Sequence, residues 1–489
     1  MSATTNGDAK YGTRPTAILH RTPWRPPVAS SAEGIYVTLE DGKRLIDAVG
    51  GAAVSCIGNG HPKVRQAIKD QVDKMSYVYN MQLSNDIAEE LAHYLVATSK
   101  GAFSAVGFVS GGSEAMEGVI KTARQYFYET GQPQRTNFIA RKLSFHGNTV
   151  GTLSLAYHPT RRAPYLSLLN EQSFHHVSPA YAARFKGKEE SEEEYVERLR
   201  KELEDKFVEL GPDTVIGCEW SDLVWMYALI YIFSLFVVVA ETVVGATTGV
   251  VAAPKGYFKA MKSVCDKYGA LFILDEVMSG MGRMGTLHAW ESYGDGIAPD
   301  IQAVAKGLGG GYVSIGAVLM SQRIADGVRD NAGFWKHGHT YQAHPIACAG
   351  ALAVQKVIEE ENLLANINEK GAHLGALLRA RLTGPNARAA PYVFDIRGGA
   401  AWWAVEWEFD MAAAAAKGYA GKTFAMDVQA RALENGLIVM GFTGGSNIEG
   451  TKGNHNMLSP AYNVTKEEVE TIVDVFVKTI EEILAENGL

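Results

Sequence analysis

An alternation of helical and strand-like patterns constrains the fold of this chain most strongly. Apolar residues recur at helical intervals in VRQAIKDQVDKM (64–75) and IAEELAHYLVAT (87–98). The runs AVGFVS (105–110), NFIARK (137–142) and ALFILDEV (270–277) are short and apolar enough for buried strands. Strands that alternate with helices form a mostly parallel sheet with helices on both faces, so the pattern predicts an α/β fold.

The pattern changes after about Gln342. Residues 347–382 (ACAG…RARL) predict one long helix. Two strand-like runs follow, YVFDIRG (392–398) and AAWWAVEW (400–407), and residues 466–487 predict a closing helix. We interpret this order as a second, smaller α/β domain at the C-terminal end of the chain.

The composition excludes several classes of function. The chain has 489 residues and a formal net charge of −8, so it lacks the basic excess of a nucleic-acid-binding protein. Its four cysteines are scattered, without a CxxC pair or metal-ligand spacing, which is typical of a reducing compartment and predicts no metal site. Residues 1–17 lack the apolar core of a secretory signal, so we expect a cytoplasmic protein.

One apolar stretch raises the question of a membrane span. Leu223 to Ala240 is an 18-residue run without a charged residue, about the length at which a transmembrane helix must be considered. A span is expected to have basic flanks, but the flanking residues Glu219, Asp222 and Glu241 are acidic. A span would also cut through the alternating strands and helices, so we predict no membrane partner.

A glycine-rich turn offers a candidate anion site. The strand-like run VGFVS ends in Gly111-Gly112-Ser113, and a helical pattern begins at once. The free backbone N–H groups at a helix start attract anions, glycines let a phosphate approach, and the Ser113 hydroxyl is a further donor. The alternative is an ordinary strand–helix turn with a serine N-cap.

Two charged residues extend this candidate site. Asp275 ends an apolar run, at the strand end where open α/β sheets bind ligands. Lys306 lies in the mostly apolar AVAKGLGGG, where a lysine is a candidate for covalent catalysis. With the phosphate turn, the pair meets the needs of pyridoxal phosphate: the lysine attaches the cofactor, and the aspartate holds a proton on its pyridine nitrogen.

A second glycine-rich run supports a different reading. GMGRMG (280–285) follows a strand-like run and fits the fingerprint of a dinucleotide-binding turn. However, Asp275 and Glu276 lie between that strand and the glycines, where their charges would repel a diphosphate. We therefore favour the pyridoxal-phosphate interpretation.

At these motifs the sequence resembles the class III pyridoxal-phosphate aminotransferases, the ω-aminotransferases of fold type I. The resemblance covers nearly the whole chain and includes SGGSEA, SFHGNT, ILDEV, AVAKGLGGG and GHTYQAHP in the family's order. It implies a cofactor site made of Gly112 and Ser113 at the phosphate, Phe145 and Val277 on the two ring faces, His146 as a further contact, Asp275 at the pyridine nitrogen, Lys306 as the attachment point, and Thr340 at the phosphate of the neighbouring subunit.

The resemblance also implies an organisation of the chain. Residues 1–62 would form an N-terminal arm and a segment that packs with the small domain. Residues 63–341 would form the large, cofactor-binding domain with the mostly parallel sheet, and residues 342–489 the smaller α/β domain. The role of Thr340 implies a homodimer with shared active sites.

The function that the resemblance implies is transamination. An amino group would pass from an amine or ω-amino acid to a keto acid, with pyruvate as the expected acceptor, by a ping-pong mechanism in which Lys306 is the general base and acid. The alternatives are a decarboxylase, aminomutase or epimerase with the same cofactor, or a protein inactivated by the apolar stretch. A transaminase differs from these enzymes because it converts its cofactor to pyridoxamine phosphate with an amine donor alone.

Two carboxylate-binding arginines of related enzymes are missing here. At the corresponding places this chain has Asn148, after the glycine of SFHGNT, and Met440, in GLIVMGF. Arg161, Arg162 and Arg397 remain, and we expect each of them to form a structural ion pair. A donor with an apolar stem is therefore favoured.

The apolar stretch is best explained as an insert. The resemblance requires one strand before ETVVGATTG, but this chain offers two, DTVIGC (213–218) and FVVVAE (236–241). We predict an insert at about residues 219–238 and hypothesise a non-native origin such as translated intron sequence. A mature transcript that encodes the stretch without a neighbouring exon boundary would contradict that origin.

Overall fold

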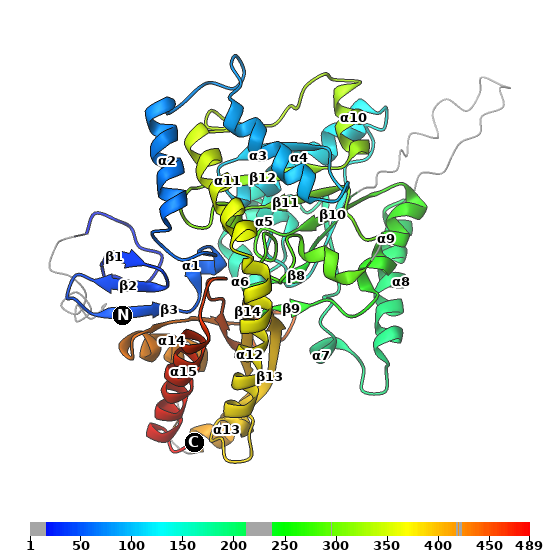
Figure 1. Cartoon of the computed structure of the whole chain (residues 1–489). Coiled ribbons are helices and arrows are strands. Elements are labelled where there is room, and N and C mark those ends of the chain that lie inside the picture. Colours follow the sequence, from blue (N-terminus) through cyan, green and yellow to red (C-terminus); the bar gives the residue numbers. More distant parts are fainter. Residues whose placement is uncertain (1–15, 212–236, 295, 417–418, 420–422) are drawn as a thin grey trace.

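A seven-stranded sheet carries the alternation of strands and helices (Figure 1). All of its neighbouring strands are parallel except β12, which is antiparallel to both of its neighbours, so the predicted mostly parallel sheet is confirmed. In spatial order the strands are β4 (Ala105–Val109), β12 (Gly316–Met320), β11 (Ile301–Val304), β10 (Leu271–Asp275), β7 (Val237–Glu241), β5 (Phe138–Arg141) and β6 (Phe174–Val177). This computed structural model describes residues 16–211, 237–294, 296–416, 419 and 423–489.

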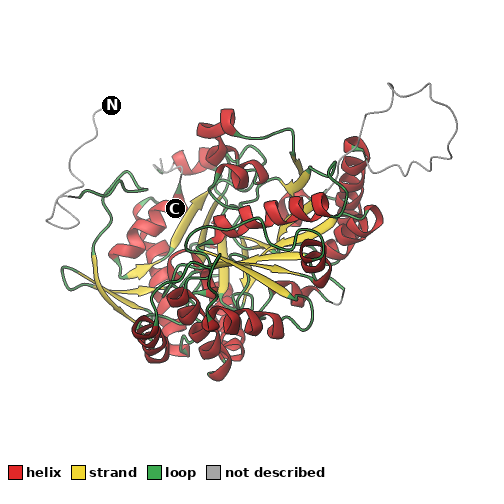
Figure 2. Ribbon diagram, turned by 90° about the horizontal axis from the view of Figure 1, so that it is seen from above, coloured by secondary structure: helices red, strands yellow, loops and turns green. Residues whose placement is uncertain are grey.

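Alternating side chains of each strand enter two different cores. In β10, Leu271 and Ile273 belong to one buried cluster, whereas Phe272 and Leu274 belong to another. Helices therefore cover both faces of the sheet (Figure 2). The first cluster includes α4 (Gly112–Glu129), α5 (Val150–Leu155) and α10 (Gln322–Arg329). The second includes α3 (Asp86–Thr98), α8 (Glu192–Leu210), α9 (Tyr257–Tyr268) and α11 (Pro345–Glu360).

Two four-stranded sheets share a third core with residues from both ends of the chain. The first sheet has the order β1 (Ala29–Glu33), β2 (Tyr36–Leu39), β3 (Arg44–Asp47) and β15 (Leu437–Ile438). The second has the order β13 (Val393–Gly399), β14 (Trp402–Trp407), β17 (Asn454–Leu458) and β16 (Met440–Thr443). Helices α2 (Pro62–Lys74), α12 (Leu363–Leu382), α14 (Phe424–Glu434) and α15 (Lys466–Glu486) add to this core.

Short elements complete the described fold. They are α1 (Gly50–Ala53), α6 (Pro159–Arg162), α7 (Ala182–Phe185), α13 (Met411–Ala416) and the hairpin of β8 (Val243–Val244) with β9 (Val251–Ala252).

The predicted long helix of residues 347–382 is two helices. Helix α11 ends at Glu360, and α12 begins at Leu363. Between them Asn362 has a φ of 52°, in the left-handed region that ends a right-handed helix. The apolar spacing continues across the break, which explains why the sequence pattern missed it. As a result, α12 contacts α15 and β13 in the smaller core.

Strand β7 shows which of the two candidate runs supplies the central strand. Val237 to Glu241 pair in parallel with β10, and the strand also pairs with β5, so the described residues of the run FVVVAE fill this place. The other candidate run, DTVIGC, lies outside the described residues. Most of the predicted insert, residues 219–236, lies outside the described residues. Its last two residues, Val237 and Val238, are buried in β7 and pair with β10.

The part of the chain that the structure describes contains no helix that is long and apolar enough to cross a membrane.

Candidate active site

The carboxyl ends of three parallel strands bring titratable side chains to one edge of the large sheet. Asp275 is the last residue of β10, and its register partner Glu241 is the last residue of β7. Lys306 follows the next strand, β11, by two residues. Open α/β sheets bind ligands at this edge, so the strand topology itself assembles these three groups.

The glycine-rich turn lies at the same edge. Helix α4 begins at Gly112, with Gly111 in extended conformation before it. A Cβ atom added to Gly112 would lie 2.6 Å from Cγ1 of Val277, so no larger residue fits there. A Cβ atom at Gly111 would meet nothing within 4 Å, so the turn is open on that side. The first N–H groups of α4 and the Ser113 hydroxyl are thus available to an anion.

Hydrogen bonds fix the orientation of Asp275. His146 Nδ1 lies 2.8 Å from Asp275 Oδ2, and the Val277 backbone N–H donates to Asp275 Oδ1 at 3.0 Å. The preceding residue, Phe145, donates its N–H to Glu241 Oε1 at 2.9 Å. The segment of residues 145–146 is therefore tied to the ends of both β10 and β7.

One cavity of about 460 Å³ joins these groups. Its volume lies in the range of small-molecule sites, roughly 300–1,000 Å³. Every predicted site residue except Thr340 lines it: Gly112, Ser113, Phe145, His146, Asp275, Val277 and Lys306. The sequence prediction had not included other lining residues, among them Arg21, Arg161, Glu241, Ser279 and Ser314.

Burial changes the acid–base properties of the cavity. It lowers the pKa of Lys306, while the negative charges of Asp275 and Glu241 oppose that shift. Burial likewise raises the pKa of Glu241. Lys306 also has a φ of 43°, a left-handed conformation that is costly for a residue with a side chain and is found most often at functional sites. The lysine is thus held in a fixed place, with its amine biased toward the neutral form.

Two buried polar atoms of the cavity lining have no hydrogen-bond partner among the described residues. They are His146 Nε2 and Ser279 Oγ. Unsatisfied buried polar groups are rare in proteins and call for a ligand or ordered water. With the anion-binding turn and the buried lysine, these atoms fit a phosphorylated heteroaromatic aldehyde such as pyridoxal phosphate.

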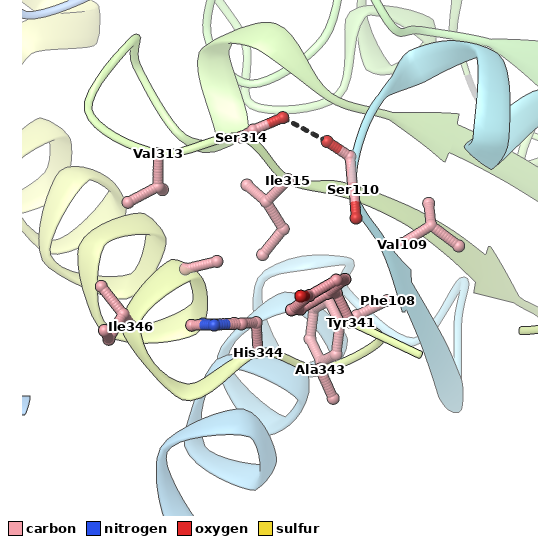
Figure 3. Close-up of a pocket in the computed structure, with 11 residues that line it drawn as sticks. Phe108, Val109, Ser110, Val313, Ser314, Ile315, Tyr341, Ala343, His344 and Ile346 are labelled. Atoms are coloured by element: carbon pink, nitrogen blue, oxygen red, sulfur yellow. Dashed lines mark hydrogen bonds between the residues drawn. The ribbon is translucent and has the colours of Figure 1, made fainter. Parts of the chain in front are cut away.

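Thr340 lies outside this cavity. It is exposed, and its backbone oxygen accepts a hydrogen bond of 2.8 Å from the Tyr77 hydroxyl. Next to it is a second pocket of about 270 Å³, where the side chains of Tyr341 and His344 face Ile315 (Figure 3). The two cavities share lining residues at Ser110 and 313–315.

Among the three arginines, the expected ion pairs form at two. Arg162 Nη2 lies 3.4 Å from Glu171 Oε1, and Arg397 Nη1 lies 2.6 Å from Glu406 Oε2. The expectation is wrong for Arg161, which has no acidic partner within ion-pair distance among the described residues. Arg161, on the short helix α6, instead lines the cavity.

The second glycine-rich run, GMGRMG, does not line the cavity. Its glycines serve packing: a Cβ atom at Gly285 would lie 2.2 Å from Asn368 Oδ1 of α12. Arg283 between them is buried and donates to the Ser459 and Pro460 carbonyls. The run therefore packs against the C-terminal part of the chain. This arrangement agrees with the prediction that the run is not a dinucleotide site.

The sequence matches the family described as Aminotransferase class-III over residues 21–209 and 235–480. The chain belongs to the class III aminotransferases. The match leaves out residues 210–234, which overlap the predicted insert at about residues 219–238. Class III aminotransferases depend on pyridoxal phosphate, so the protein is a pyridoxal-phosphate-dependent aminotransferase of the α/β fold that these enzymes share.

Three relatives illustrate how far this similarity extends. An aminotransferase of Gibberella zeae is 41% identical over 449 residues, covering 91% of this chain and 81% of that protein. The mitochondrial gamma-aminobutyrate transaminase 1 of Oryza sativa subsp. indica is 30% identical over 485 residues, covering 96% of this chain and 85% of that protein. The structure of the omega transaminase of Pseudomonas jessenii in complex with PMP has a TM-score of 0.82 and 28% identity, covering 100% of this chain and 99% of the other.

Proposed function

We propose that this class III aminotransferase moves an amino group from an amine or ω-amino acid to a keto acid, with pyruvate as the acceptor, by a ping-pong mechanism. The observation that carries the proposal is the convergence of Lys306, Asp275 and the Gly111–Ser113 turn on one cavity. The similarity to a gamma-aminobutyrate transaminase supports an ω-amino acid as donor.

The residues of the cavity would hold the cofactor as follows. The N–H groups at the start of α4 and the Ser113 hydroxyl would bind the phosphate, and Gly112 would keep the approach open. Phe145 and Val277 would contact the ring, with His146 as a further contact. Thr340 would bind the phosphate in the neighbouring subunit. When bound, pyridoxal phosphate supplies an electron sink that stabilises negative charge on the substrate carbon.

Lys306 and Asp275 carry the proton chemistry. Because burial lowers the pKa of Lys306, its Nζ is available as a base nearer to neutral pH than an exposed lysine. Nζ takes the proton from the amine-bearing carbon of the donor and later returns one as an acid. The Asp275 carboxylate holds a proton on the pyridine nitrogen, and His146 and the Val277 N–H keep that carboxylate in place.

Half-reaction spectroscopy tests the proposal. The purified protein, loaded with pyridoxal phosphate, is mixed with 4-aminobutyrate alone, and the cofactor's absorbance is followed. We expect the yellow absorbance to be replaced by that of pyridoxamine phosphate, and pyruvate to restore it. A decarboxylase, aminomutase or epimerase would turn over its substrate without this change. If a panel of amines and ω-amino acids leaves the absorbance unchanged, the proposed transamination is refuted.

We also propose a homodimer with shared active sites. Two exposed aromatic side chains adjoin Thr340: Tyr77, which donates to the Thr340 oxygen and is 38% exposed, and the next residue, Tyr341, which is 62% exposed. The Tyr77 and Tyr341 rings contact each other, with centroids 5.7 Å apart. Neighbouring exposed aromatic side chains of this kind are compatible with a protein interface. A second copy on this surface would bring the exposed Thr340 to its neighbour's cavity.

Replacing Tyr341 with aspartate is expected to weaken this dimer. Burying an unpaired carboxylate in an apolar interface is unfavourable, so we expect at least a tenfold rise in the dimer dissociation constant, or about 1.4 kcal/mol. Analytical ultracentrifugation measures that constant, and cofactor absorbance after dialysis measures the loss of the shared site. Val208→Asp, at an exposed position on α8, is the control. An unchanged dimer in Tyr341→Asp would contradict the proposed interface.

We further propose the division of the chain into residues 1–62, 63–341 and 342–489 given above. The buried cluster that joins residues 35–64 with residues 354–489 supports it, because the N-terminal segment packs with the C-terminal core. The family match that leaves out residues 210–234 supports an insertion in that region.

A further inference from the structure

Arg161 places a positive charge in the lining of the cavity. It is half-buried on α6, and its guanidinium lines the space next to Phe145. Its guanidinium carbon lies 4.7 Å from the Phe145 ring centroid. No carboxylate of the described residues forms an ion pair or hydrogen bond with it. A guanidinium that lines a ligand cavity without an acidic partner is suited to bind an anionic ligand there.

The surroundings of Arg161 increase its need for an anion. Arg21 lines the same cavity, and its positive charge adds to the effect of burial in lowering the pKa of Arg161. Glu241 opposes this shift from a distance but does not pair with the guanidinium. The backbone N–H of Phe145 and that of Gly245 already occupy the two oxygens of Glu241. The cavity therefore has an excess of positive charge on the Arg161 side.

Neither Met440 nor Asn148 supplies a cation for a substrate carboxylate. Met440 lines the cavity with an uncharged side chain. Asn148 is exposed, and its backbone N–H donates to Ser113 Oγ at 2.9 Å. A keto acid such as pyruvate nevertheless brings a carboxylate into the site, and that charge has to be compensated there.

We propose that Arg161, with Arg21 beside it, binds the carboxylate of the substrate and thereby selects keto acids and amino acids over aldehydes and simple amines. The inference rests on the proposed transamination and names the substrate class of that same site. A guanidinium suits this role because its planar donors match the two oxygens of a carboxylate. Arg161 is a specificity residue, because the carboxylate does not take part in the amino transfer.

The test compares two acceptors that differ in one group. Pyridoxamine-phosphate-loaded enzyme is mixed with pyruvate or with propanal, which lacks the carboxylate, and kcat/KM is measured for each. Charged hydrogen bonds are worth about 1.5–3 kcal/mol, so we expect Arg161→Gln to lower the pyruvate/propanal ratio by about 10- to 100-fold. We expect Arg161→Lys to lower this ratio less than Arg161→Gln does. The ratio is taken within one preparation, so a partly unfolded variant does not affect it.

A binding measurement without turnover accompanies the kinetic ratio. Propionate has pyruvate's carboxylate but no keto group, and its dissociation constant is obtained by titrating the cofactor absorbance of the pyridoxal-phosphate enzyme. We expect this constant to rise at least tenfold in Arg161→Gln. Arg162→Gln is the matched control, because that neighbouring arginine is paired with Glu171 instead of lining the cavity.

The outcomes separate the inference from the proposed function. If wild-type enzyme converts pyruvate but Arg161→Gln keeps both the acceptor ratio and the propionate affinity, the role of Arg161 is refuted. An equal loss in Arg162→Gln would also refute it, because the effect would then be one of general charge. If wild-type enzyme converts neither acceptor, the proposed transamination itself fails, and propionate binding alone still reports on Arg161.

Discussion

Replacing Lys306 with alanine is expected to reduce transamination by at least roughly 10²–10⁴-fold, the range that a positioned acid–base group contributes. In the proposed mechanism the Lys306 amine has two tasks, because it would both attach the cofactor and move the proton of the donor carbon. Neighbouring groups cannot replace this amine. Among the cavity-lining residues named above, the remaining bases are two carboxylates and an imidazole, those of Asp275, Glu241 and His146.

The measurement is the rate of pyruvate-dependent amino transfer by wild type and variant, each saturated with pyridoxal phosphate. Lys121→Ala, an exposed lysine on α4, is the control for a change of surface charge. Added methylamine should restore part of the rate in Lys306→Ala, since it returns an amine base to the space that the side chain leaves. A variant that retains more than about a tenth of wild-type activity would contradict the assignment of Lys306.

The site was easiest to predict where a residue's chemical type and its position at a strand end both indicated the same functional role. Asp275 ends an apolar run, and Lys306 follows the next one, so a parallel sheet necessarily brings them to one edge. The Gly111–Ser113 turn is predictable for a similar reason, because a strand that leads directly into a helix leaves N–H groups free at that same edge.

Features that depend on long-range packing could not be predicted in this way. Glu241 ends a strand as Asp275 does, but two candidate runs competed for that strand, and only pairing with β10 decides between them. Whether Arg161 forms an ion pair depends on which side chains surround α6, and the local sequence pattern does not indicate these side chains. The break at Asn362 is equally hidden, because the apolar spacing continues on both sides of it.

Replacing Asp275 with asparagine should separate chemistry from cofactor binding. The two side chains have the same shape, and the amide oxygen can still accept the hydrogen bond from the Val277 N–H. The amide nitrogen would then face His146 Nδ1, which can accept if the imidazole proton moves to Nε2. Because Nε2 has no partner among the described residues, this shift breaks no hydrogen bond there. We therefore expect a folded variant that retains cofactor.

The rate, in contrast, should fall by at least tenfold, or about 1.4 kcal/mol of barrier, because a neutral amide cannot stabilise a proton on the pyridine nitrogen. Single-turnover measurements with a donor give that rate. Thermal melting shows whether the variant is folded, and cofactor absorbance shows whether it retains the cofactor. Asp300→Asn is the matched control: this carboxylate accepts the Phe272 N–H at 2.9 Å, just before β11 and so at the opposite end of the strands from the cavity. The Asp300→Asn variant should be less stable than wild type but should keep the wild-type single-turnover rate per bound cofactor. If Asp275→Asn reacts within tenfold of wild type while Asp300→Asn behaves in the same way, the charge of Asp275 has no part in the reaction, and the proposed role of this residue is wrong.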